Sequence, residues 1–480
     1  MQPVSSEAQA VPRQWSARRL PAVIMNWLRT DLFRRTDSGP VGWRKILLAT
    51  GALIVGTAIS LSRTLGPGSL NTVWIEDAKF LLNQGLNMPA WQAISSPISS
   101  YYQEPARLVT EGALRVFPLS WVPGVMSIAA AAEYAMYGLV AYIASGPHLR
   151  SPWLRLLIAA PVCAMPLAYT QVNNDLVTVQ FFGLYGAFWT VLWLPGTRAG
   201  KILSPLVMAT VSWTAVLSVF VAPLIVARLI VDRSKSAWCL AILWVTGVLL
   251  QFSQTIIGKG HHNEYGDNGL FWVLRHYMTR VIPRAMFGER SLGGAGVNYR
   301  GYIAPLHVIN HHAHDALIAG AWLIVLIVIA IAVTRFTDPN WTLAIVAAVF
   351  SVGIFIEEML INMAVVQSRY VIAPALLLYT ALVALLRPRE VPAASNVSTA
   401  VRWLPSVSTA VRWLPVTGLA VLLAVAVTLN FRVTNGRTTS PAWTSVVASA
   451  TRACASTPHI TAYTFVHEWW WVTIPCDKVG

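Results

Sequence analysis

Residues 72–82 read TVWIEDAKFLL, and the rest of the chain can be arranged around this stretch. It follows the first long apolar segment and holds two adjacent carboxylates, Glu76 and Asp77. Only 11% of the residues are charged, less than half of the roughly 25% found in soluble domains. Two neighbouring carboxylates close to an apolar segment therefore call for an explanation.

The chain has the composition of a membrane protein. Of its 480 residues, 55% are hydrophobic and 21 are tryptophan, and the mean hydropathy is +0.56. A spanning helix needs about 20 apolar residues, and the sequence supplies about eleven such stretches. Their apolar runs are continuous rather than alternating, which excludes a membrane β-barrel. We expect an all-α polytopic membrane protein with about eleven transmembrane helices.

Basic residues set the expected orientation. They precede the first span and recur in the turns at 147–150, 196–201, 232–235, 335 and 387–389. Because cytoplasmic loops carry the excess of Lys and Arg, we expect a cytoplasmic N-terminus and an extracytoplasmic C-terminus. The net charge of +15 is divided among loops, so nucleic acid is not an expected partner. The predicted spans are 45–61, 121–145, 153–169, 177–194, 203–219, 222–231, 237–257, 316–333, 343–359, 370–386 and 417–431.

We divide the chain into three parts. Residues 1–44 form a basic cytoplasmic tail, residues 45–431 the transmembrane domain, and residues 432–480 a small extracytoplasmic cap. Cys454 and Cys476 both lie in the cap, where oxidising conditions permit a disulfide. The outer loops, 63–118 and 258–314, contain stretches with amphipathic helical spacing that could lie flat at the interface, at 76–86, 103–117 and 271–287.

One repeat is exact. VSTAVRWLP at 397–405 recurs at 407–415. Two copies are too few for a solenoid. We interpret them as a tandem duplication in a cytoplasmic loop and assign them no function.

An acidic pair in an outer loop has two interpretations. Acids favour helix N-termini, so Glu76 or Asp77 could simply cap the helix that follows. Alternatively, a carboxylate can act as a general base that deprotonates an acceptor hydroxyl. Two adjacent acids could divide this work, and we choose Asp77 as the base and Glu76 as the group that orients the acceptor.

The segment Trp74-Ile75-Glu76-Asp77, in the first outer loop of a many-span chain, resembles the membrane-embedded glycosyltransferases of the C-type fold. Members of that family use a polyprenyl-phosphate sugar and carry an acidic pair at this place. Ala78 stands where many members have glycine, a departure from the pattern. The resemblance implies a bacterial plasma (inner) membrane enzyme, with membrane lipids around it. It would transfer a monosaccharide to a cell-envelope glycan, glycolipid or protein acceptor and need no cofactor.

A leaving phosphate requires cationic donors, and guanidinium groups suit it. Arg369, at the outer start of the tenth span, is the first candidate, although a basic residue at a span end often only snorkels. Arg275, Arg280 and Arg284, in the predicted helix at 271–287, are the alternatives. Candidates for contacts with the sugar or the acceptor are Trp74, Glu104, Arg107, Asn173, Asn174, His261, His262 and Tyr370.

Two further alternatives remain open. The histidines His261, His262, His311, His312 and His314 show no firm zinc-ligand spacing, so a divalent metal is not expected. Glu133 lies near the middle of the second span, and a carboxylate at that depth is a reason to consider a transporter or flippase. A polymerase or ligase of lipid-linked saccharides would need similar basic outer loops.

Overall fold

The computed structural model describes residues 20–36, 39, 41–98, 101–167, 174–256, 269–292, 311–362, 367–389, 407–433, 435–457, 459–467 and 470–479. In this part of the chain the protein is a helical bundle with one two-stranded sheet. Seven helical segments are long and apolar enough to cross a membrane, at 43–61, 119–144, 235–253, 312–333, 341–360, 368–385 and 410–429. The chain is therefore a multi-pass, mainly helical membrane protein.

A helix occurs at each of the eleven predicted places, but four of these helices are too short to be counted as membrane-spanning. The predicted number of eleven spans is therefore not confirmed. Every residue of α9 except Gln180 is buried. Because short or irregular segments are tolerated at membrane depth where protein surrounds them, such a helix need not reach both interfaces. The four are α8 (Pro152–Cys163), α9 (Val179–Leu192), α10 (Arg198–Ser212) and α11 (Ala222–Val231).

The core of the bundle is built from α6 (Val122–Ala144), α9 and α17 (Ile372–Leu385). All residues of α17 are buried, and α16 (Trp341–Asn362) packs along it. Peripheral helices instead expose large apolar side chains, which suits contact with lipid. These helices are α2 (Trp43–Leu61), α12 (Lys235–Ile256), α15 (His311–Val333) and α18 (Val407–Leu429).

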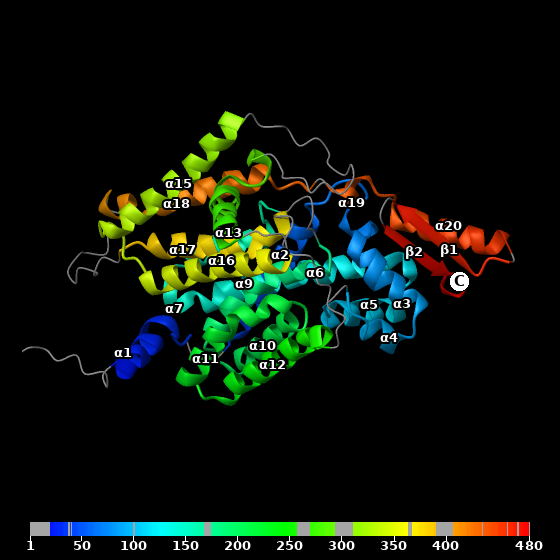
Figure 1. Cartoon of the computed structure of the whole chain (residues 1–480), viewed down its shortest axis with the longest axis horizontal. Coiled ribbons are helices and arrows are strands. Elements are labelled where there is room, and N and C mark those ends of the chain that lie inside the picture. Colours follow the sequence, from blue (N-terminus) through cyan, green and yellow to red (C-terminus); the bar gives the residue numbers. More distant parts are fainter. Residues whose placement is uncertain are drawn as a thin grey trace, which may run out of the picture.

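One end of the bundle, the turn end, gathers three of the turns predicted to be cytoplasmic. Arg387 donates to the carbonyl of His148 in α7 (Gly146–Leu149) over 3.1 Å. The amide of Gly196 donates to the hydroxyl of Thr36 over 3.4 Å. The N-terminal helix α1 (Leu20–Trp27) lies at the same end as α7 (Figure 1).

The opposite end, the loop end, is built from segments far apart in the sequence. In Figure 1 it is the end with α3 (Asn83–Asn87), α4 (Ala90–Ile94), α5 (Glu104–Val116), α20 (Trp443–Ser456) and the sheet. Helices therefore form in the predicted amphipathic stretches 76–86 and 103–117. The third stretch, 271–287, is also helical, as α13 (Leu270–His276), a π-helical turn (Tyr277–Val281) and α14 (Ile282–Phe287).

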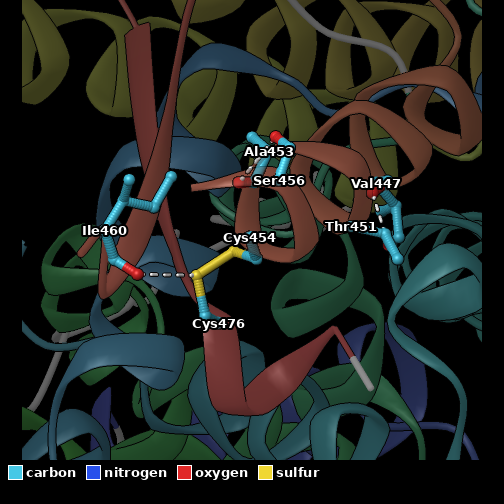
Figure 2. The surroundings of a disulfide bond; sticks show 7 residues. All are labelled: Val447, Thr451, Ala453, Cys454, Ser456, Ile460 and Cys476. Atoms are coloured by element: carbon cyan, nitrogen blue, oxygen red, sulfur yellow. Dashed lines mark hydrogen bonds between the residues drawn. A yellow bond between two sulfur atoms is a disulfide. The ribbon is translucent and has the colours of Figure 1, made fainter. Parts of the chain in front are cut away.

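The C-terminal residues fold onto the first loop. Strands β1 (Ala462–His467) and β2 (Trp470–Pro475) pair antiparallel, with Ala462 opposite Pro475. The amide of Thr473 in β2 donates to the side chain of Asn83, and Asn87 donates to the carbonyl of Thr473. Cys454 and Cys476, the two cysteines predicted to pair, are joined by a disulfide (Figure 2).

The repeat is one place where the structure differs from expectation. Its second copy, 407–415, forms the first turns of α18 and is not a loop, so the predicted start of the last span at 417 was wrong. Pro415 lies inside this helix, as membrane helices tolerate. The first copy, 397–405, lies outside the described residues.

Candidate active site

The acidic pair begins a helical run at the loop end. Asp77 opens a π-helical turn, η4 (Asp77–Leu82), which continues directly into α3. Because the two side chains are adjacent at the start of this run, they point in different directions. Glu76 remains one-quarter exposed, whereas Asp77 is 3% exposed.

Asp77 holds a neighbouring loop. Its two carboxylate oxygens accept hydrogen bonds from the amides of Leu176 (3.0 Å) and Val177 (3.1 Å), between α8 and α9. Burial, with the nearby carboxylate of Asp175, raises the pKa of Asp77 to about 8, although the two amides and Arg437 act in the opposite direction. Asp77 does not cap its own helix, so that interpretation is wrong for this residue.

Beneath the pair lies a cation that the sequence analysis missed. Arg437, in α19 (Gly436–Thr439), is 1% exposed and interacts electrostatically with Asp175 and Asp77. Its guanidinium donates to the carbonyls of Ser69 (2.9 Å), Thr72 (2.8 Å) and Asn174 (3.0 Å) and to the hydroxyls of Thr72 (3.0 Å) and Ser127 (2.8 Å). A buried carboxylate needs a partner, and this requirement could have pointed to a cation such as Arg437.

Glu76 has a different partner. Its Oε1 is 3.2 Å from Nη1 of Arg369, across 293 positions of sequence. Its Oε2 has no hydrogen-bond partner among the described residues. Arg369 lies against two aromatic rings, with its guanidinium carbon 5.7 Å from the centroid of Phe181 and 5.6 Å from that of Tyr370. One predicted acid and the first predicted phosphate-binding arginine are thus brought together.

The alternative arginines lie elsewhere along the chain. Arg275 is exposed and Arg280 is partly buried. Arg284 is 6% exposed and interacts with Glu289, which in turn accepts a hydrogen bond from Ser368, the neighbour of Arg369. Arg284 therefore supports the segment that carries Arg369, and no contact of the other two with the acidic pair is seen in the described residues.

Several candidates for sugar contacts are corrected by their burial. Asn174 is fully buried, and its amide is used by Ser60 and by the hydroxyl of Ser69, so it has no surface left for a sugar. Tyr370 is 4% exposed and packs against Phe181.

Arg107 is also unsuited to contact with a sugar, because it is 2% exposed. It donates to the carbonyls of Ala93 and Phe80 and so holds α4 and η4 onto α5. Glu104 is partly exposed, and burial raises its pKa to about 7.

Trp74 stays adjacent to the acidic pair. It is 6% exposed, packs edge-on against Trp470 at 6.3 Å between centroids, and its indole nitrogen has no partner among the described residues. Asn173, His261 and His262 lie outside the described residues. Within the described part, no three His, Cys, Asp or Glu side chains are grouped so that they could hold a metal ion.

Comparisons with known proteins add little. No protein-family model and no curated protein matches the chain. Among solved structures, the cryo-EM structure of the arabinofuranosyltransferase AftD from Mycobacteria matches with 17% identity and a TM-score of 0.37. The match covers 82% of this chain but only 27% of AftD, so this chain spans about a quarter of that protein's length. A likeness at this level supports neither a fold nor an activity.

Proposed function

We propose that the protein is a glycosyltransferase of the C-type fold that uses a polyprenyl-phosphate sugar at the outer face of the bacterial plasma membrane. The observation that carries the proposal is the contact between Glu76 and Arg369 at the loop end. It pairs a guanidinium with a partly exposed carboxylate whose Oε2 is buried and has no hydrogen-bond partner among the described residues. These are the two groups that transfer from a lipid phosphate requires.

The proposed orientation rests on charge. The turn end carries an excess of basic residues, so we place it in the cytoplasm. The acidic pair and the C-terminal cap then face outward, where a disulfide is stable. The basic residues described at this end include Arg29, Arg34, Arg35, Arg44, Lys45, Arg150, Arg198, Lys201, Arg335, Arg387 and Arg389, with Asp31 and Asp338 among the few acids.

The geometry favours Glu76 over Asp77 as the proton acceptor. Asp77 is buried and both of its oxygens are occupied by backbone amides. Oε2 of Glu76 has no such partner. We therefore assign Asp77 to positioning the loop at 174–177, and Glu76 to the reaction itself.

The reaction then proceeds by exchange of partners. The donor phosphate binds Arg369, which releases the carboxylate of Glu76. That carboxylate takes the proton from the acceptor hydroxyl while the hydroxyl oxygen bonds to the anomeric carbon. The bond between that carbon and the phosphate oxygen breaks, and the lipid phosphate leaves with its charge partly neutralised by Arg369.

The test is transfer by the purified protein in lipid nanodiscs, with radiolabelled polyprenyl-phosphate sugars and a panel of envelope acceptors. Glu76→Gln should reduce transfer by roughly a hundred- to ten-thousand-fold while donor binding persists. Arg369→Ala should weaken donor binding by about tenfold or more. The matched control is Asp338→Asn, which breaks a comparable ion pair with Arg387 at the turn end and should leave transfer unchanged.

The transporter alternative depends on Glu133 in α6. Tyr137, one turn along the same helix, donates to its carboxylate over 3.3 Å, which is a sufficient structural partner. A transporter driven by Glu133 predicts the reverse ranking, with Glu133→Gln inactive and Glu76→Gln mild. Full turnover in both Glu76→Gln and Asp77→Asn would leave the glycosyltransferase proposal without support.

A further inference from the structure

A second site lies on the same loop end, away from Glu76 and Arg369. It is a pocket of about 630 Å³ between the segment at 85–90, the C-terminal half of α5, α20 and the end of the chain. This volume is within the usual range for small-ligand sites. Its walls include Gly85, Glu111, Leu114, Arg115, Val447 and Lys478.

Glu111 provides an unused acceptor in this pocket. The residue is 7% exposed, and its Oε1 has no hydrogen-bond partner among the described residues. Its Oε2 is 3.9 Å from Nε of Arg115. A buried carboxylate oxygen without a donor is costly unless a ligand supplies one. A hydroxyl group would supply it.

The pocket wall carries two cations, Arg115 and Lys478, and one anion, Glu111, and Asp477 lies beside it. Arg115 accompanies Glu111, and Nζ of Lys478 is 3.9 Å from the carboxylate of Asp477. Leu114 and Val447 add apolar surface, which suits the C–H faces of a sugar ring. Because Asp477 offsets the charge of Lys478, a polyanion would meet no net positive charge here, whereas a neutral polyhydroxyl compound would find acceptors, donors and apolar contacts.

The pocket is linked to the acidic pair by one helical run. Asp77 starts that run and Gly85 lies two turns further along it, at a distance of about 12 Å by helical rise. The far wall is fixed by the disulfide, since Cys476 precedes Lys478 and Cys454 lies on α20 with Val447 (Figure 2).

We propose that this pocket binds a neutral oligosaccharide. This inference rests on the proposed function: the bound oligosaccharide is the part of the acceptor chain a few sugar units away from the hydroxyl that reacts. The pocket then selects acceptors by length, because only a chain that reaches both places gains its binding energy.

The experiment measures binding and transfer separately on the full-length protein in nanodiscs. The probes are linear neutral gluco-, manno- and arabino-oligosaccharides of increasing length, with inorganic polyphosphate as the anionic probe. We expect Kd values of about 0.1 to 1 mM for the best neutral series. Glu111→Leu should weaken binding about tenfold or more. Ala90→Trp, which fills the pocket from its rim, should do the same if Glu111→Leu fails to fold.

The matched control is Val116→Trp, since Val116 is on the same helix, 72% exposed and outside the pocket. It should bind as the wild type does. Glu76→Gln should lose transfer but keep oligosaccharide binding. Wild-type binding without any transfer would refute the proposed function and leave the pocket assignment standing. Equal binding by wild type and both pocket variants, no binding of any neutral probe, or preference for polyphosphate would overturn the pocket assignment.

Discussion

Removal of Arg437 should test the charge arrangement beneath the acidic pair. The side chain is 1% exposed, donates at least five hydrogen bonds and interacts electrostatically with Asp77 and Asp175. Arg437→Met preserves most of the side-chain length but leaves the buried acids Asp77 and Asp175 without this charge, and above the pKa of about 8 of Asp77 this leaves a buried carboxylate uncompensated. Breaking a buried pair in this way costs about 3 to 5 kcal/mol.

For a chain of this length, each kcal/mol corresponds to about 1 to 2 °C in Tm, so Arg437→Met should melt roughly 5 °C lower. Differential scanning fluorimetry in detergent measures the shift. The control is Arg432→Met, because Arg432 is exposed and makes one hydrogen bond to the carbonyl of Ser62. Equal shifts for the two variants would refute the reasoning.

A double variant separates charge from packing. At about pH 9, above the pKa of about 8 of Asp77, Asp77→Asn in the Arg437→Met background removes one unbalanced carboxylate, so it should restore about 1 to 2 kcal/mol. If the losses simply add, Asp77 and Arg437 are not coupled, and the electrostatic account of this site fails.

Three more predictions follow from the structure. The pKa of Asp77 is raised from 3.8 to about 8, so its contribution to the free energy of unfolding is most favourable below pH 4 and is lost as the pH rises to 8. Over that pH window the Tm of the wild type should fall relative to that of Asp77→Asn. A constant difference in Tm would contradict the pKa shift. The disulfide closes a separation of 22 residues, so Cys454→Ser should destabilise the cap by about 3 kcal/mol. Faster proteolysis of the C-terminal segment would show this loss, and mass spectrometry of the unreduced wild type should find the linked peptides. Reporter fusions at residues 90 and 460 should both read as extracytoplasmic and one at residue 389 as cytoplasmic; a cytoplasmic signal at residue 90 would reject the enzyme proposal as well.

Sequence patterns predicted most helices because the length and periodicity of an apolar stretch can be seen in neighbouring residues. They located α2, α6, α12 and α16 to within a few residues, together with the amphipathic helix α5. They could not foresee that α9 is short and buried on nearly all sides, since this depends on which helices surround it. The last span was predicted to start at 417, but α18 begins at Val407 and contains Pro415, since proline is tolerated inside a membrane helix.

The site was predicted only in part for a similar reason. Glu76 and Arg369 were identified separately from their positions at the ends of apolar segments. Their contact, and the burial of Asp77 on the amides of Leu176 and Val177, depend on segments about 100 to 290 residues apart. Arg437 was missed because nothing local distinguishes a structural arginine from a solvated one.

The docking of β2 onto α3 determines when the site can form. The amide of Thr473 donates to the side chain of Asn83, 390 positions earlier, and Asn87 donates to the carbonyl of Thr473, 386 positions later. At about 5 to 20 residues per second, the ribosome needs roughly 20 to 80 s to make the intervening chain. During that time the helix that begins at Asp77 has been synthesised but lacks one of its walls. The first loop must therefore wait for β2, so a chain released before β2 is made would be inserted in the membrane with this end unfinished.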